Sequence, residues 1–198
     1  MTKPSLKRNL FILVALFIFS NSFLYAQKNF FTISAGASKA LGEGSDNINL
    51  GFNGSLSSFT KASNNVFVGG KISYNHFGVD TGEIENTFPG VDLSASMSIL
   101  ELLPIIRIFP SVNFEEKTNY FLQAGLGYYS LTAKATAKYQ GESNSDSESE
   151  GNFGLNLGIG IILGQSGTTK VEVSPNYNII FTEDESTKYF SINVGIIL

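Results

Sequence analysis

Residues 188–198 read KYFSINVGIIL, a stretch that alternates between two kinds of side chain. From Phe190 to Leu198 every second residue is apolar, and most of the residues between them are small or polar. Because successive side chains of a strand point to opposite faces, this pattern predicts a β-strand with one apolar face. A strand this regular has an edge that must be paired, and its simplest partner is the first strand of the same chain. The stretch therefore predicts a sheet that closes on itself as a barrel.

The same two-residue alternation recurs along the chain and predicts eight strands. They are residues 29–40, 47–59, 65–77, 91–109, 119–139, 152–163, 169–182 and 188–198. The apolar residues change phase near Ile99 and near Ser130, and each change predicts a β-bulge. The fifth segment exceeds the roughly 11 residues that cross a bilayer, so we expect it to project beyond the membrane. The predicted fold class is all-β, an eight-stranded antiparallel up-and-down transmembrane β-barrel.

The connections between the predicted strands alternate in character. The first, third, fifth and seventh together hold 12 of the chain's 17 acidic residues and no Lys or Arg, whereas the other three are compact. The acidic connections are residues 41–46, 78–90, 140–151 and 183–187. Alternate connections share one end of an antiparallel barrel, so one end is predicted to be acidic and long-looped, as in outer-membrane barrels. The Ser- and Glu-rich residues 140–151 predict a solvated, mobile loop.

The first 26 residues have the pattern of a secretory signal peptide. Three basic residues precede an apolar run from Leu10 to Phe19, which is shorter than the about 20 residues of a spanning helix. We expect cleavage after Ala26, so that residues 27–198 form the barrel; an uncleaved membrane anchor is the alternative. Without the signal the chain has 10 basic and 17 acidic residues, and this net charge of −7 argues against nucleic acid as a partner.

Composition excludes several kinds of chemistry. The chain has no Cys and one His, so a disulfide, a thiolate metal site and a multi-His metal site are all excluded. The acidic residues 140–151 lack the spacing of a Ca²⁺-binding loop, and there is no glycine-rich phosphate-binding motif. We therefore expect neither a cofactor nor a metal ion. Charged residues make up 15% of the chain, below the roughly 25% of soluble domains.

Aromatic residues gather near the ends of the predicted strands. In a membrane barrel they would form the two girdles at the membrane–water interfaces, whereas in a soluble sandwich they would belong to the core. The Asn, Ser and Gly residues on the opposite strand faces favour the girdles, because a water-facing sheet carries more Lys and Glu. The predicted girdle residues are Phe30, Phe59, Tyr74, Phe77, Phe109, Tyr120, Tyr128, Phe181 and Phe190.

The lumen of an eight-stranded barrel is just wide enough for side chains, so we expect it to be filled by them. The charged residues predicted to point inward are Lys71, Asp92, Glu101, Arg107 and Glu172. Because unpaired charge in such an interior is costly, we predict a lumenal polar network with a structural role. Its members are Lys71, Glu101, Arg107, Gln123, Asn156, Glu172 and Asn176. A gated conduction path through the same residues is the alternative.

His76 is the one residue that invites a catalytic interpretation, because some eight-stranded outer-membrane barrels resemble enzymes that modify lipid A. Its own strand supplies no serine two positions away, since residue 78 is glycine. We therefore interpret His76 as an interfacial residue and predict no catalytic residues.

Two stretches carry a family resemblance: YFLQAGLGYY at residues 120–129 and LLPIIR at residues 102–107. With the alternation along residues 27–198, the sequence resembles the eight-stranded outer-membrane β-barrel superfamily of OmpA-like and OmpX-like proteins, especially the forms common in Bacteroidetes-type bacteria. The family's assembly signal usually ends in an aromatic residue, whereas Leu198 stands here. The resemblance implies insertion by the outer-membrane barrel assembly machinery into outer-membrane lipid.

The predicted function is that of a monomeric, non-catalytic outer-membrane barrel with a structural or surface-interaction role, whose acidic loops contact an extracellular partner. One alternative is a narrow channel for small solutes. Another is a soluble periplasmic barrel that binds an apolar ligand inside. The membrane barrel turns its large aliphatic side chains outward to lipid and the soluble one turns them inward, and alternation by itself does not distinguish the two.

Overall fold

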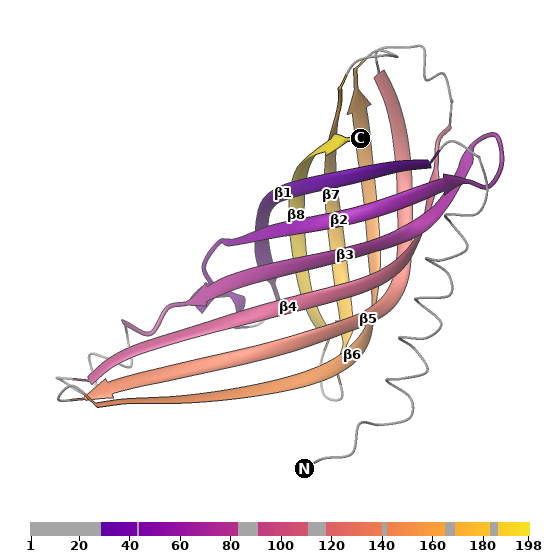
Figure 1. Ribbon diagram of the computed structural model, residues 1–198. Coiled ribbons are helices and arrows are strands. Elements are labelled where there is room, and N and C mark those ends of the chain that lie inside the picture. Colours follow the sequence, from indigo (N-terminus) through magenta and orange to yellow (C-terminus); the bar gives the residue numbers. More distant parts are fainter. Residues whose placement is uncertain are drawn as a thin grey trace.

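Eight antiparallel strands form a closed barrel in which each strand pairs with its neighbours in chain order, as Figure 1 shows. The computed structural model describes residues 29–42, 44–82, 91–110, 118–139, 142–164, 169–182 and 186–198, so the predicted signal peptide lies outside the described residues. The strands are β1 (Asn29–Leu41), β2 (Gly51–Lys61), β3 (Val66–Val79), β4 (Val91–Ile108), β5 (Thr118–Tyr139), β6 (Glu142–Leu163), β7 (Lys170–Phe181) and β8 (Ser186–Ile197). The predicted all-β fold class is confirmed.

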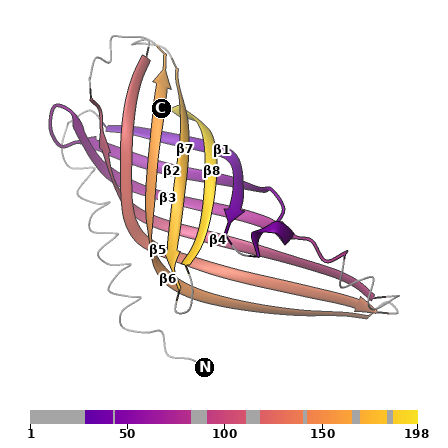
Figure 2. The ribbon, with the colours of Figure 1, turned by 180° about the vertical axis from the view of Figure 1, so that it is seen from behind.

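The barrel closes where the last strand meets the first, as the alternation of residues 188–198 predicted. β8 pairs with β1 in a register that runs from Thr32 opposite Ile197 to Leu41 opposite Lys188. Figure 2 shows the two strands side by side. A short 3-10 helix, η1 (Ser45–Asn47), lies between β1 and β2, at the end of the predicted turn of residues 41–46, and β2 begins at Gly51 and not at Asn47 as predicted. Within the described residues, no helix is long and apolar enough to cross a membrane.

The two faces of the wall have opposite character. Large apolar side chains are exposed on the outside of all eight strands, whereas Asn, Ser and charged side chains are buried inside. Consecutive residues of β6 illustrate this, because Asn156 is 0% exposed and Leu157 is 45% exposed. This orientation contradicts the soluble alternative, in which the aliphatic side chains would fill the interior.

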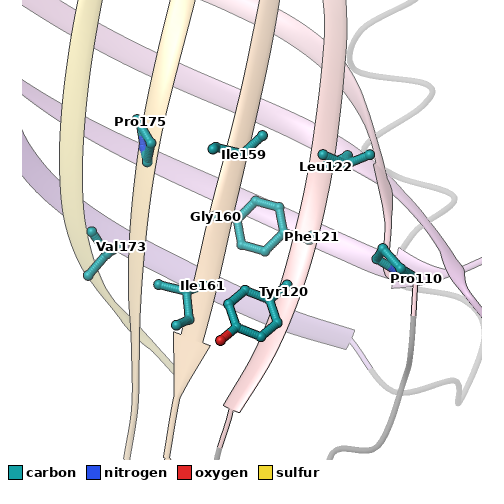
Figure 3. Close-up of a pocket in the computed structure, with 9 residues that line it drawn as sticks. All are labelled: Pro110, Tyr120, Phe121, Leu122, Ile159, Gly160, Ile161, Val173 and Pro175. Atoms are coloured by element: carbon teal, nitrogen blue, oxygen red, sulfur yellow. The ribbon is translucent and has the colours of Figure 1, made fainter.

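The apolar outer band has the height of a hydrocarbon core. On β5 the outward residues from Tyr120 to Tyr128 are aromatic, aliphatic or alanine, and on β4 the corresponding span runs from Leu100 to Ile108. Transmembrane β-strands need about 9–11 residues to cross a bilayer. Figure 3 shows part of this band, where Leu122 of β5 and Ile159 of β6 line an apolar recess that reaches Pro175 of β7.

The two bulges predicted near Ile99 and Ser130 are wrong. The pairing of β4 with β3 and with β5 keeps one register from end to end, and so does that of β5 with β6. The alternation of side chains between the two faces continues without a break. What changes along these strands is the environment of each face. Leu93, Met97 and Ile99 therefore lie on the same inner face as Glu101. For the same reason Asp92, predicted to point inward, is exposed on the outer face.

The change of surroundings occurs at one level of the barrel. Tyr74, Leu100, Ser130 and Gly151 are successive cross-strand neighbours on the outer face of β3 to β6. Beyond this row the outer face of β4, β5 and β6 becomes Ser, Thr, Lys and Asp, and on β4 and β5 apolar residues move to the inner face. A polar outer face is stable in water but not in hydrocarbon, so the row marks one edge of the apolar band.

Strands β4, β5 and β6 continue well beyond this row and form a sheet that projects from the barrel, and β3 runs beside β4 as far as Val79 (Figure 1). We call residues 91–99, 131–139 and 142–150 the extension. The mobile loop predicted at residues 140–151 is wrong, because β6 begins at Glu142 and pairs with β5 from there onward. Hydroxyl pairs join the two strands, Thr132 with Ser149 at 2.8 Å and Thr136 with Ser145 at 3.0 Å. Ser at every second position from 143 to 149, with Glu, Asp or Asn between, is the strand pattern, although the composition of this stretch indicates a loop.

Inward glycines make room for aromatic rings. A Cβ at Gly154 would lie 2.5 Å from the carbonyl oxygen of Ile179 and 2.6 Å from a ring carbon of Tyr129. Figure 3 shows the same arrangement farther along the same two strands, where Phe121 of β5 lies beside Gly160 of β6.

We expect Gly154→Ala to lower the free energy of unfolding by about 1–3 kcal/mol, because a methyl group has no space there. Urea titration of the protein folded in lipid vesicles measures this. Gly54→Ala is the matched control, since the nearest atom to its Cβ is 3.9 Å away. Equal stabilities for the two variants would contradict this account of the glycines.

Candidate functional site

The inside of the barrel holds two polar networks, and the first surrounds Glu101 of β4. The Nζ of Lys71 lies 3.2 Å from Oε2 of Glu101 as an ion pair. Asn75 Nδ2 donates to Oε1 at 2.6 Å, Ser73 Oγ donates to it at 3.1 Å, and the hydroxyl of Tyr189 donates to it as well. Three donors and one cation therefore compensate a carboxylate that is 1% exposed.

The strand registers explain why these groups meet. Ser73 lies directly opposite Glu101 in the pairing of β3 with β4. Lys71 and Asn75 are two residues to either side of Ser73 and share its inward face. Tyr189 reaches Glu101 from β8, a strand that does not neighbour β4. The first network therefore ties the two sides of the barrel together.

The second network surrounds Arg107, also on β4. Its two terminal nitrogens donate to the two carboxylate oxygens of Glu172 of β7, each at 2.7 Å, and its Nε donates to Oε1 of Gln123 at 3.0 Å. This bidentate geometry is the strongest form of an Arg–carboxylate contact. Because β4 and β7 are not neighbours, the ion pair crosses the lumen.

From Gln123 the network continues through amide groups. Gln123 Nε2 donates to Oδ1 of Asn156 at 3.0 Å and to Oδ1 of Asn176 at 2.6 Å. Asn156 Nδ2 then donates to Oδ1 of Asn178 at 2.8 Å, and the hydroxyl of Tyr129 donates to the same oxygen at 3.2 Å. The chain of amides fills the space between β5, β6 and β7 and satisfies most of its own polar groups.

Two aromatic rings enclose the guanidinium of Arg107. Its central carbon lies 3.9 Å from the ring centroid of Phe59 and 4.2 Å from that of Phe121. The ring faces attract a cation electrostatically, most strongly where water is excluded. Arg107 is therefore held by its hydrogen bonds to Glu172 and Gln123 and by its contacts with the rings of Phe59 and Phe121.

At the end of the barrel away from the extension, five phenylalanines form a continuous cluster. Ring centroids are 5.7 Å apart for Phe30 and Phe59, 5.1 Å for Phe30 and Phe67, 5.1 Å for Phe67 and Phe109, and 5.6 Å for Phe109 and Phe121. We call these residues the aromatic cluster. It closes the lumen beneath Arg107.

The aromatic girdle prediction is therefore wrong for several residues. Phe59, Phe77 and Phe109 are 0% exposed, and Phe30 packs against the same core. Tyr74, Tyr120, Phe181 and Phe190 do lie exposed on the outer wall. Position along a strand indicates closeness to an interface, but the phase of the strand decides between lumen and lipid.

A second apolar layer lies on the extension side of the networks. Phe77 and Tyr189 pack edge to face with ring centroids 6.0 Å apart, and Ile99, Tyr129 and Ile180 are buried with them. The polar networks thus lie between two apolar layers. In this arrangement the ion pairs of the two networks join strands of the barrel wall, and an apolar layer separates them from water at each end of the lumen.

The structure places all seven residues of the predicted lumenal network inside the barrel, in two separate groups. Lys71 and Glu101 belong to the first network, and the other five to the second. The two networks contain further residues that were not predicted, although they point inward on the same strands. They are Ser73, Asn75, Tyr129, Asn178 and Tyr189.

The rest of the lumen wall, on β1, β2 and β8, carries small polar residues. Ser34 and Ser55 share a hydrogen bond of 2.7 Å, and Asn53 Nδ2 donates to Ser38 Oγ at 2.8 Å. Ser38 in turn donates to Asn75 at 2.8 Å, which joins this side to the first network.

His76 lies on the outer wall and meets residues from other strands. Its Nδ1 lies 3.0 Å from Oγ of Ser98, and the hydroxyl of Tyr74 donates to the same oxygen at 2.9 Å. Ser98 is the direct cross-strand neighbour of His76 but lies 22 residues away in the sequence, so the residues around His76 did not predict this contact. Among the described residues no carboxylate hydrogen-bonds the imidazole, so the third group of a catalytic triad is missing from this part of the chain.

No group of His, Asp and Glu within the described ranges is arranged to hold a metal ion.

An eight-stranded barrel with an apolar outer wall and a polar interior defines the class of outer-membrane β-barrels. Solved structures of that class share the fold. A major outer membrane protein from Thermus thermophilus superposes with a TM-score of 0.55 at 11% identity, over 86% of this chain and 98% of that one. Ail, the attachment invasion locus protein of Yersinia pestis, gives 0.51 at 16% identity, over 88% and 100%.

Neisserial surface protein A also superposes, with a TM-score of 0.51 at 13% identity over 86% of this chain and 96% of that one. At these identities the likeness shows a common fold. No family model matches the sequence, and the search of curated proteins found no match.

We expect Glu172→Gln to lower the free energy of unfolding by about 3–5 kcal/mol, because it leaves the Arg107 charge buried without its partner. Urea unfolding from lipid vesicles measures this. The double variant Arg107→Met with Glu172→Leu removes both charges and should regain most of the loss. A single variant as stable as the original protein would show that the ion pair is not what holds β4 to β7.

Proposed function

We propose that this chain is an integral outer-membrane protein of a Gram-negative bacterium with a structural or surface-interaction role and no catalytic one. The observation that carries this proposal is the apolar band on the outside of the barrel, which has the height that lipid requires. Its origin in a Bacteroidetes-type bacterium is supported by the sequence resemblance alone.

The filled lumen supports a barrel that does not conduct. Arg107 packs against Phe59 and Phe121 of the aromatic cluster, and it is hydrogen-bonded to Gln123, from which the chain of amide groups continues. A solute would have to separate buried ion pairs to pass, which is costly because a lone charge would remain in the interior.

The extension supports a role at the cell surface. In antiparallel outer-membrane barrels the long connections lie outside the cell, and the extension belongs to the end with the acidic connections. Its outer face is Ser, Thr and Lys, which suits an aqueous environment. We further propose that export depends on the signal at residues 1–26, that the barrel assembly machinery inserts the chain, and that it functions as a monomer in outer-membrane lipid.

The test is electrophoretic migration in SDS of the detergent-extracted protein, unheated and boiled, together with conductance in a planar bilayer. We expect a fast unheated band that slows on boiling and no steady ion current, because the barrel is closed and its lumen filled. A single unchanging band from a soluble periplasmic fraction would overturn the membrane location. Steady single-channel steps would overturn the non-conducting role.

A further inference from the structure

In the extension, the edge of β6 that faces away from β5 has no ladder partner among the described residues. β6 pairs with β5 from Glu142 onward, but its pairing with β7 begins only at Phe153. Along residues 142–152, therefore, one side of β6 makes no ladder hydrogen bonds within the described part of the chain. Residues 142–151 are also exposed to solvent. Such an edge presents a row of N–H and C=O groups that another strand can pair with.

On the opposite side of the projecting sheet, another segment of the chain covers part of the edge. There the end of β3 is covered by the segment that follows η1. Ile48 forms a bridge with Val79, the N–H of Asn49 donates to the carbonyl of Gly78 at 2.8 Å, and that of Asp80 donates to Asn47 at 2.8 Å. This part of the opposite edge is therefore covered by the chain itself, whereas the edge of β6 has no ladder partner within the described residues.

The open edge carries charge on one face and small groups on the other. Of its inward-facing positions, Glu142, Asp146, Glu148 and Glu150 are acidic, whereas the outward-facing positions from 143 to 149 are all Ser. Cross-strand neighbours on one face have Cβ atoms about 4.5–5.5 Å apart, so a strand added here would place most of its side chains on that face beside a carboxylate and the others beside Asn144 or Asn152. Lys or Arg at those positions would be stabilised, and the serines leave the other face unobstructed.

A second copy of this chain is a poor occupant. Pairing two β6 edges would place acidic residues directly opposite acidic residues, and like charges opposite each other destabilise a sheet. The charge pattern therefore selects a different, basic partner.

We propose that the edge of β6 from Glu142 to Asn152 binds an extended segment of another protein that carries Lys or Arg at alternate positions, by adding it as a strand. This inference rests on the proposed surface-interaction role and names the kind of partner. Main-chain hydrogen bonds supply the affinity, and the carboxylates supply the selectivity for basic side chains.

The test uses the full barrel in phospholipid nanodiscs and a fluorescent peptide of about eleven residues that alternates Lys and Thr, which matches the length of the edge. We expect saturable binding that weakens as salt rises. A peptide of the same charge with alternate backbone nitrogens methylated should bind at least about tenfold more weakly, because it cannot complete the ladder. A peptide that alternates Glu and Thr should not bind.

Two charge-matched variants locate the site. Glu148→Lys should weaken binding of the Lys–Thr peptide about tenfold, because it replaces an attractive cross-strand pair with a repulsive one. Asp92→Lys makes the same charge change on the outer face of β4, away from the edge, and should alter binding by less than about twofold. Each variant is first shown to keep the heat-dependent shift in SDS, which verifies that the barrel is intact.

Equal binding of the methylated peptide would overturn strand addition, and equal effects of the two variants would overturn the site. An intact barrel that binds no basic peptide would show that the carboxylates only protect the edge from pairing. Dimers that form as protein concentration rises, and that Ser147→Pro prevents, would assign the edge to a second copy instead. Absence of the heat-dependent shift in the original protein would refute the barrel proposal itself, before any peptide is added.

Discussion

Every feature of this protein depends on the fixed two-residue period of side chains in a closed sheet. Once eight strands close, each residue is committed to the lumen or to the outside, and a strand cannot change this without a bulge. The registers of β4, β5 and β6 contain no such break. The inner and outer faces of the barrel therefore carry two independent sequences of residue types. Each suits the environment of that face at each level along the barrel axis.

The inner pattern is layered. The aromatic cluster, the networks of Arg107 and Glu101, and the apolar layer around Tyr189 follow one another along the axis. The ion pair between Arg107 and Glu172 and the hydrogen bond from Tyr189 to Glu101 join strands that are not neighbours. Because the lumen is narrow, side chains can span it, and the barrel is held together across its interior as well as around its wall.

The outer pattern changes where the surroundings change. Up to the row that contains Tyr74 and Leu100 it is apolar, and beyond that row it is hydroxylated and charged. The inner face of the extension compensates by becoming apolar near Met97 and Leu131, which pack against the core. The extension thus has a polar outer face, whereas the barrel has an apolar one. Strands β4, β5 and β6 run through both parts.

Alternation and composition are local properties of the chain, and they were enough to predict the number of strands, their closure and the candidates for the lumen. Lys71, Glu101, Arg107 and Glu172 were predicted to point inward and are buried inside, whereas Asp92, predicted in the same way, is exposed on the outer face. The fold was needed to show which face meets lipid, that Phe59 and Phe109 lie inside, and that Arg107 pairs with Glu172 across the lumen. The physical reason is that these depend on register and on the height at which the surroundings change, and both are set by partners far along the chain. For the same reason residues 142–150, whose composition indicates disorder, became a strand once β5 lay beside them.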